Sequence, residues 1–149
     1  MNKRIFLADD DKDDCLFFND AIKELQLPIQ LTTVNDGEEL MRQLFQITSD
    51  LPHALFLDLN MPRKNGYTCL SEIKTNNALS TIPVIIFSTS YDEHVANELY
   101  RKGAHYYICK PADFGDLKKV ISDAFELLNH TKGQPSIEDF LITKPKVAL

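Results

Sequence analysis

Four short apolar runs in this sequence each end abruptly at a polar side chain. Apolar runs without polar alternation are typical of strands buried on both faces, as in parallel sheets. The runs and the groups that follow them are residues 5–8 before Asp9 and Asp10, residues 54–57 before Asp58, residues 84–87 before Ser88, and residues 106–109 before Lys110. Because open α/β sheets bind ligands at the carboxyl ends of their strands, we expect these polar groups to converge at one edge.

The rest of the chain predicts strands and helices in alternation. Strands are expected at residues 4–8, 30–34, 54–57, 84–87 and 105–109, and helices from the acidic run to about residue 25 and at 38–45, 67–74, 92–102 and 114–128. Asp13 and Asp14 are expected to cap the first helix or to serve as first-turn acids favoured by its dipole. Five such alternations in 149 residues predict one domain, a doubly wound α/β sandwich with a parallel sheet.

Charge and hydropathy exclude several classes of protein. The formal net charge is −6, which argues against nonspecific binding to nucleic acid. No long apolar stretch predicts a membrane helix, and no signal peptide is recognised at the N-terminus. The three cysteines, Cys15, Cys69 and Cys109, are widely spaced among apolar neighbours, so we expect buried thiols of a cytoplasmic protein.

Residues 129–149 differ in character from the sequence before them. They are too long for a helix end, and Ser136 could cap one short turn that carries Ile137, Phe140 and Leu141. Two interpretations stay open for this C-terminal extension. It is a loose tail lying on the body of a domain at residues 3–128, or an arm that packs on a second copy in a homodimer.

The polar groups at the predicted sheet edge suit phosphoryl chemistry. Three clustered carboxylates (Asp9, Asp10 and Asp58) repel one another unless a cation lies among them, and oxygen ligands without His or Cys favour Mg²⁺. Beside a divalent ion, a free carboxylate is suited to act as the nucleophile that attacks a phosphoryl group. Lys110 and Ser88 could then hold oxygens of that phosphoryl group. Taken alone, Asp10 could be a cap, Ser88 a loop hydroxyl and Lys110 a solvated cation.

A calcium-loop interpretation of the acidic run fails. Asp9, Asp11 and Asp13 have the spacing of an EF-hand, but Asp14 stands where that loop needs Gly and Asp20 where it needs Glu.

The separated motifs resemble the response-regulator receiver domain, including the single-domain chemotaxis regulator and the stand-alone receivers that partner phytochrome kinases. The resemblance covers about residues 3–128 and rests on Asp9-Asp10, on Asp58 within Asp-Leu-Asn-Met-Pro, on Ser88 and on Lys110-Pro111. It implies a flavodoxin-like (βα)5 fold with strand order 2-1-3-4-5.

The resemblance also implies roles for individual residues. Asp58 is the expected phosphoacceptor, and Mg²⁺ is expected to bind the side chains of Asp10 and Asp58, Asp9 through water, and the Asn60 backbone carbonyl. The phosphoryl group is expected to be held by Ser88 and Lys110.

A switch and an output surface follow from the same resemblance. Tyr107 matches an aromatic side chain that moves inward on phosphorylation, and the expected output face comprises residues 92–102, 105–109 and 114–128. The family's phosphate lifetime depends on the positions occupied here by Asn60 and Ser90.

The resemblance implies a signalling protein and not an enzyme acting on a separate substrate. A sensor histidine kinase or histidine phosphotransfer protein is the expected donor, and the output is expected to be binding of an unknown downstream protein or onward relay. The alternative is a degenerate receiver that acts only as an interaction module. A haloacid-dehalogenase-type phosphatase normally has an acid where Asn60 stands, and a flavodoxin-like redox module would place its phosphate where Asp9, Asp10 and Asp11 repel it.

Overall fold

The computed structural model describes residues 2–47, 49–130 and 132–143. The elements, in chain order, are β1 (Lys3–Ala8), α1 (Lys12–Glu24), β2 (Ile29–Val34), α2 (Gly37–Gln46), β3 (Ala54–Leu57), α3 (Gly66–Thr75), β4 (Val84–Ser88), α4 (Glu93–Arg101), β5 (Tyr106–Cys109), α5 (Phe114–His130), α6 (Ile137–Phe140) and β6 (Leu141–Thr143). The ten elements expected from the sequence are all present, with ends that differ by a residue or two.

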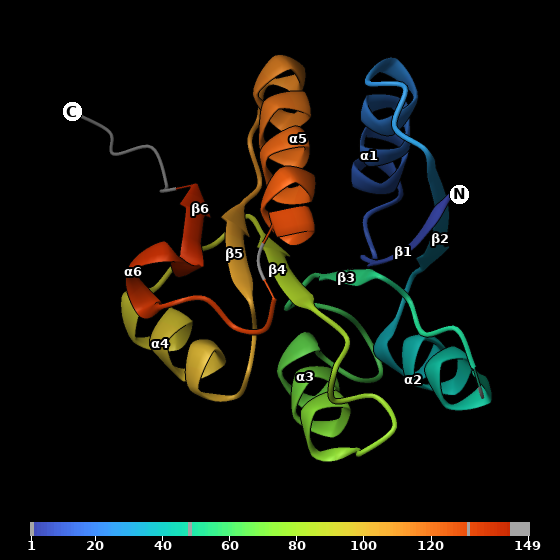
Figure 1. The fold of residues 1–149 in the computed structure, drawn as a ribbon, viewed down its shortest axis with the longest axis vertical. Coiled ribbons are helices and arrows are strands. Elements are labelled where there is room, and N and C mark those ends of the chain that lie inside the picture. The colour runs from blue at the N-terminus through green and yellow to red at the C-terminus, as the bar shows by residue number, and fades with distance from the viewer. Residues whose placement is uncertain (1, 48, 131, 144–149) are drawn as a thin grey trace.

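All the strands pair in parallel in one sheet with the order β2-β1-β3-β4-β5-β6. The predicted order 2-1-3-4-5 is confirmed, and β6 adds a strand beside β5. Figure 1 shows the sheet between two helical layers, with α1 and α5 on one side and α2, α3 and α4 on the other. This is the doubly wound α/β sandwich that the alternation predicted.

Each face of the sheet packs a separate hydrophobic core, because alternate residues of every strand point to opposite sides. On the side of α1 and α5, Phe18, Phe56, Phe87 and Phe125 lie against one another with ring centroids 4.9–6.2 Å apart. The other core is mainly aliphatic and lies under α2, α3 and α4. Burial on both faces explains why β3 and β4 read as continuous apolar runs.

Short polar side chains fix where four of the helices begin. Asp36, Asn65 and Asp92 each accept a hydrogen bond from a backbone N–H in the first turn of α2, α3 or α4. At α1 the cap is Asp11, whose carboxylate accepts from the amides of Asp13 and Asp14. The expectation that Asp13 or Asp14 is the cap was therefore wrong, while their placement as first-turn acids is confirmed.

The C-terminal extension forms structure of its own on the body of the chain. After α5 the chain returns along α4, forms α6 and adds β6 to the free edge of β5 (Figure 1). Phe140 is buried against the rings of Tyr100 and Tyr107, at centroid distances of 5.2 and 6.2 Å. The short turn expected after Ser136 is confirmed, although the Ser136 side chain makes no cap hydrogen bond.

These contacts bear on the two interpretations of the extension. Residues 137–143 lie on the body of the chain, as the tail interpretation expected, but they are packed and paired and not loose. A homodimer stays a prediction, and residues 144–149 lie outside those described.

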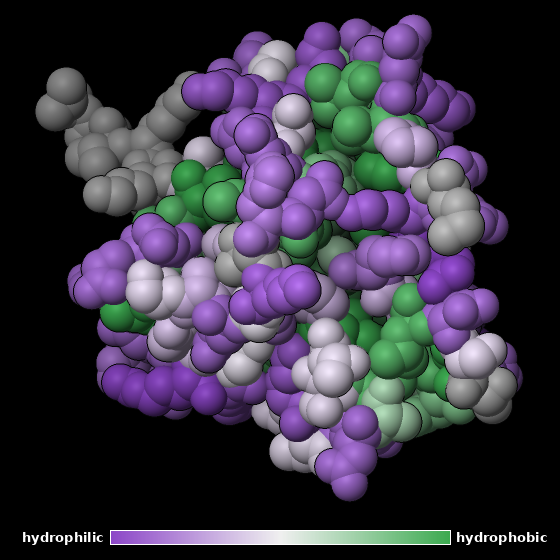
Figure 2. Space-filling model, viewed as in Figure 1, coloured by the Kyte–Doolittle hydropathy of each residue, from purple (hydrophilic) through white to green (hydrophobic). Residues whose placement is uncertain are grey.

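The surface seen in Figure 2 is mostly hydrophilic, with hydrophobic areas between α1 and α5 and beside α2. Leu16, Phe17 and Phe45 are large apolar side chains that are about half exposed. Cys15, Cys69 and Cys109 are buried free thiols, as expected. Among the helices of the described ranges, none combines the length and the hydrophobicity needed to span a bilayer.

Candidate functional site

Backbone hydrogen bonds carry the parallel ladder one step beyond the strands and position the polar residues. The amide of Asp9 donates to the carbonyl of Val34 at 3.0 Å, and that of Asp58 donates to Ala8 at 2.9 Å. Between β5 and β4, the Lys110 amide donates to the carbonyl of Ser88 at 2.8 Å. Each residue is therefore held at the carboxyl end of its strand by the neighbouring strand.

Three carboxylates meet at this edge. Asp9, Asp10 and Asp58 each offer an oxygen, and these oxygens lie within 4.8 Å of one another. Asp9 is fully buried, Asp58 is 6% exposed and Asp10 is exposed. The predicted acidic cluster is thus present, with two members in the protein interior and one facing solvent.

Lys110 places an ammonium group among these acids. Its Nζ donates to Asp9 Oδ2 at 2.6 Å and to Asp14 Oδ2 at 2.9 Å, and it lies 3.9 Å from Asp58 Oδ2. It also lies 5.4 Å from the centre of the Phe87 ring, so an aromatic face covers part of it. The interpretation of Lys110 as a solvated cation was therefore wrong.

The site's electrostatics are dominated by burial. Desolvation raises the pKa of Asp58 to about 6, and the nearby Lys110 only partly offsets it. Burial also raises the pKa of Asp9, against the hydrogen bond from Lys110. For Lys110, burial lowers the pKa, but its hydrogen bonds to Asp9 and Asp14 outweigh burial and the net change is upward. One ammonium does not neutralise these carboxylates.

The loop after β3 approaches Asp58 closely, and a glycine makes this possible. A Cβ at Gly66 would lie 2.3 Å from the Asp58 carbonyl oxygen, so a larger side chain would displace the backbone of the site. The Gly66 amide donates to the Leu59 carbonyl at 2.9 Å, and the Asn60 backbone donates a hydrogen bond to the Asp58 carboxylate.

Ser88 and Tyr107 occupy the two strands beyond β3. Ser88 is buried at the end of β4, where its hydroxyl lies 3.2 Å from the Ser90 hydroxyl and accepts from the Ser90 amide at 3.3 Å. The Tyr107 side chain is buried, and its hydroxyl donates to the Ser90 carbonyl. Burial raises the pKa of Tyr107 to about 12, so the hydroxyl keeps its proton. Ser90 therefore contacts both residues.

Asp14 was missed as a member of this constellation. The sequence places it in the first turn of a helix, which is a sufficient local reason for an acid there. Its contact with Lys110 joins residues 96 positions apart, and only the folded chain reveals it.

The donor atoms at this edge fit a hard divalent cation. All three clustered side chains are carboxylates, which suit Mg²⁺, Mn²⁺ or Ca²⁺. Burial raises the pKa values of Asp9 and Asp58, so a bound cation would favour their ionised forms. A buried carboxylate beside an oxygen-donor cation site and an ammonium group is suited to attack on a phosphoryl group, with the lysine holding an oxygen of that group.

Comparison with known proteins points to one family. The profile of the response regulator receiver domain matches residues 5–122. Response regulator Rcp1 of Synechocystis is 32% identical over 123 residues, which cover 80% of this chain and 84% of that protein. A probable chemotaxis protein CheY of Rhizobium etli is 28% identical over 126 residues, covering 84% and 94%.

Solved structures give the same result. The phosphorylated cyanobacterial phytochrome response regulator RcpA superimposes with a TM-score of 0.80 at 34% identity, over 91% of this chain and 100% of that one. The Mn²⁺-bound form of Rcp1 superimposes with a TM-score of 0.77 at 30% identity, over 90% and 99%.

Proposed function

The chain belongs to the response regulator receiver domain family, and we propose that it accepts a phosphoryl group on Asp58 from a phosphohistidine of a partner protein. The observation that carries this proposal is the position of Asp58. Its carboxylate is buried at the end of a central strand, within 4.8 Å of two other carboxylates and 3.9 Å from an ammonium group.

The proposed transfer moves the phosphoryl group directly from the donor imidazole to Asp58. A carboxylate oxygen of Asp58 forms a bond to phosphorus while the bond from phosphorus to the donor imidazole nitrogen breaks. The electron pair stays on that nitrogen, which is then protonated. Lys110 pairs with a phosphoryl oxygen, and the Ser88 hydroxyl donates a hydrogen bond to another once it turns from Ser90.

We propose that Asp9, Asp10, Asp58 and the backbone carbonyl of Asn60 hold Mg²⁺. The mutual distances of the three carboxylates support this set, and the Mn²⁺-bound form of the relative Rcp1 supports divalent-ion binding in this class of proteins. When bound, the ion would supply positive charge to the carboxylates and to the phosphoryl oxygens.

Tyr107 is the proposed switch, and its packing suggests which surface responds. Its ring lies 5.5 Å from Tyr91 and 6.2 Å from Phe140, and its hydroxyl contacts Ser90 two residues after Ser88. A movement of Ser88 toward phosphate would therefore disturb Ser90, Tyr107 and the extension together. We propose that a downstream protein reads the surface of α4, β5 and α5, part of which α6 and β6 cover.

The donor is proposed to be a sensor histidine kinase or a histidine phosphotransfer protein. RcpA is named as a phytochrome response regulator, so a phytochrome-type kinase is the first donor to test. A degenerate receiver that only binds partners is the second candidate, but Asp9, Asp10, Asp58 and Lys110 are all present and in contact range.

Intact mass spectrometry tests the proposal. The wild-type chain and Asp58→Asn are incubated with acetyl phosphate and Mg²⁺, and in parallel with a chelator in place of Mg²⁺. We expect the wild type to gain one phosphate only with Mg²⁺, and Asp58→Asn to gain none. An unmodified wild type, under conditions that label a control receiver, would favour the binding-only alternative.

A further inference from the structure

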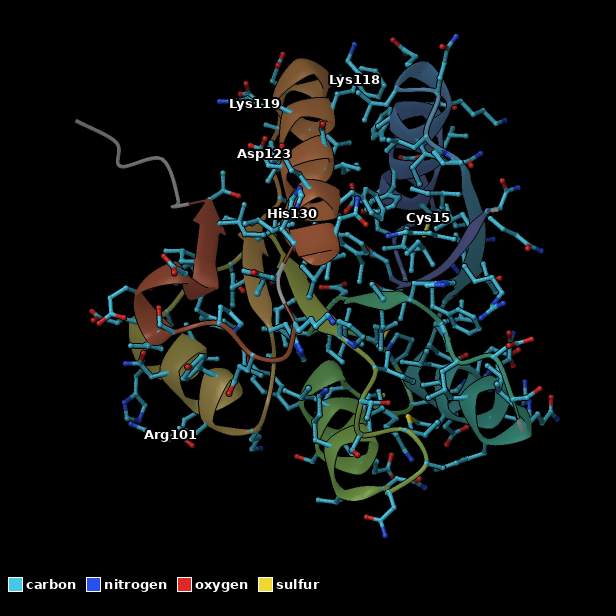
Figure 3. The ribbon with its side chains drawn as sticks, viewed as in Figure 1. Cys15, Arg101, Lys118, Lys119, Asp123 and His130 are labelled. Atoms are coloured by element: carbon cyan, nitrogen blue, oxygen red, sulfur yellow. The ribbon has the colours of Figure 1, made fainter. Side chains whose placement is uncertain are left out.

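Asp14 is the fourth carboxylate at the site, and neither the metal cluster nor the phosphoacceptor role accounts for it. It lies in the first turn of α1, one residue before the buried Cys15 that Figure 3 labels at the end of α1 nearest the site. Its side chain is 30% exposed and reaches the Lys110 ammonium at 2.9 Å. Its neighbour Asp13 belongs to the same turn but is exposed.

The geometry around Lys110 divides its three N–H donors unequally. Two are directed at Asp9 and Asp14, at 2.6 and 2.9 Å, whereas Asp58 lies 3.9 Å away, beyond hydrogen-bond distance. The ammonium is therefore held toward Asp9 and Asp14 and not toward the carboxylate that is to be phosphorylated.

Helix stability does not account for this contact. The dipole of α1 favours acids in its first turn, and Asp13 meets that preference as well as Asp14 does. Asp11 already caps the helix by accepting hydrogen bonds from the backbone amides of Asp13 and Asp14. Only Asp14 of the two first-turn acids bonds to Lys110.

We propose that Asp14 is a positioning residue that restrains phosphorylation of Asp58 by holding the Lys110 ammonium and adding negative charge beside that ammonium. This inference rests on the proposed function. A phosphoryl group carries nearly two negative charges at neutral pH. It must compete with Asp14 for Lys110, and the negative charge of the Asp14 carboxylate opposes its approach to that ammonium.

Substitution of Asp14 by Asn separates charge from geometry. The amide oxygen can still accept a hydrogen bond from Lys110, while the negative charge is lost. If charge dominates, phosphorylation becomes faster. If Asp14 instead orients Lys110 for the reaction, the substitution slows phosphorylation.

The test measures the rate of phosphate gain by intact mass with Mg²⁺ and limiting acetyl phosphate, for wild type, Asp14→Asn and Asp13→Asn. We expect Asp14→Asn to raise the rate about fivefold, as for the loss of one part-buried charge contact, and Asp13→Asn to change it less than about twofold. Damage to the fold would lower the rate, so an increase is not explained by a structural defect. A decrease, no change, or equal effects of the two substitutions would overturn the inference.

A double-mutant cycle tests whether Asp14 acts through Lys110. Thermal unfolding is measured for the wild type, Asp14→Asn, Lys110→Met and the variant that carries both substitutions. A control cycle uses Asp13→Asn in place of Asp14→Asn. We expect non-additive Tm changes only in the Asp14 cycle, and additivity there would overturn the route through Lys110. If the wild type itself gains no phosphate, the proposed function fails. If the wild type is modified but Asp14→Asn has no effect on the rate, the proposed function stands and only the inference about Asp14 fails.

Discussion

Buried titratable groups lie at both ends of the sheet, but the two ends pair those groups differently. At the carboxyl end, Asp9, Asp58 and Lys110 come from three different strand ends and face one another. At the amino end, Lys74 and His105 lie beside the starts of β4 and β5. Burial shifts pKa values at both ends, but among the described residues only the carboxyl end brings buried groups of opposite charge together.

The side chains at the amino end form hydrogen bonds with the backbone. Lys74 donates to the carbonyls of Ser80 and Ile82 at 3.0 and 2.7 Å, and burial lowers its pKa to about 8. Burial lowers the pKa of His105 to about 4, and its Nδ1 has no hydrogen-bond partner among the described residues. A cavity of about 450 Å³ lies beside both side chains.

A shifted pKa and a cavity therefore do not by themselves identify the end of this fold that carries the proposed site. Lys74 supports a loop, and His105 remains neutral in the interior. The carboxyl end differs because parallel strands deliver acids and an ammonium group to one point, where they leave an excess of negative charge.

The largest expected effect is a loss of stability in acid that comes from His105. Because burial disfavours its charged form, the pKa is about 4 in the folded chain against 6.5 for an ordinary histidine side chain. The unfolded chain therefore takes up the proton first as the pH falls below about 6.5, and the stability that the neutral histidine provides is lost toward pH 4. We expect the wild type to lose about 3 kcal/mol relative to His105→Gln between pH 7 and pH 4. Urea unfolding across this range measures it, and parallel pH profiles would contradict it.

Asp58 is expected to show the opposite dependence. Its pKa is raised from 3.8 to about 6, so the folded chain holds the proton more tightly than the unfolded chain does. Ionisation of Asp58 therefore destabilises the folded chain as the pH rises. Without divalent cations, Asp58→Asn should be more stable than the wild type by about 3 kcal/mol at pH 7.5, with most of the difference gone at pH 4. Urea unfolding in a chelator measures this. Asp123→Asn, an exposed acid on α5 (Figure 3), is the control and should change stability little. A wild type more stable than Asp58→Asn at pH 7.5 would show that the acidic cluster is already compensated.

The smallest expected effect concerns Lys74, whose substitution should change stability but not the rate of phosphorylation. Lys74→Met leaves the carbonyls of Ser80 and Ile82 without their donor, so stability should fall by about 1.5 kcal/mol. The rate of phosphate gain should stay within about twofold of the wild type, because Lys74 lies at the opposite end of the sheet. Lys102→Met, an exposed site, should change stability by less than about 0.5 kcal/mol. A folded Lys74→Met chain that is phosphorylated many times more slowly would show that the two ends are coupled.

Most of the fold and the centre of the site could be predicted because their causes are local. Apolar runs that end in Asp9, Asp58, Ser88 and Lys110 indicate strand ends, and parallel pairing then brings those ends together. The contact of Lys110 with Asp9 follows from that topology.

The features that the sequence did not reveal depend on contacts between distant segments. β6 has three residues and forms because β5 offers a free edge, which no local pattern encodes. Asp14 has an adequate local reason to be acidic, so its bond to Lys110 is invisible until both are placed. His105 and Lys74 acquire shifted pKa values from burial that depends on the packed fold.

The most direct test of the functional end is to locate the phosphate. The wild-type chain is phosphorylated with acetyl phosphate and Mg²⁺, then reduced with borohydride, which converts an aspartyl phosphate to homoserine. Peptide mass spectrometry then identifies the converted residue. We predict homoserine at position 58 and unchanged aspartate at positions 9, 10 and 14. Homoserine at another acidic position, or none while a control receiver is converted, would contradict the assignment of Asp58 as the phosphoacceptor.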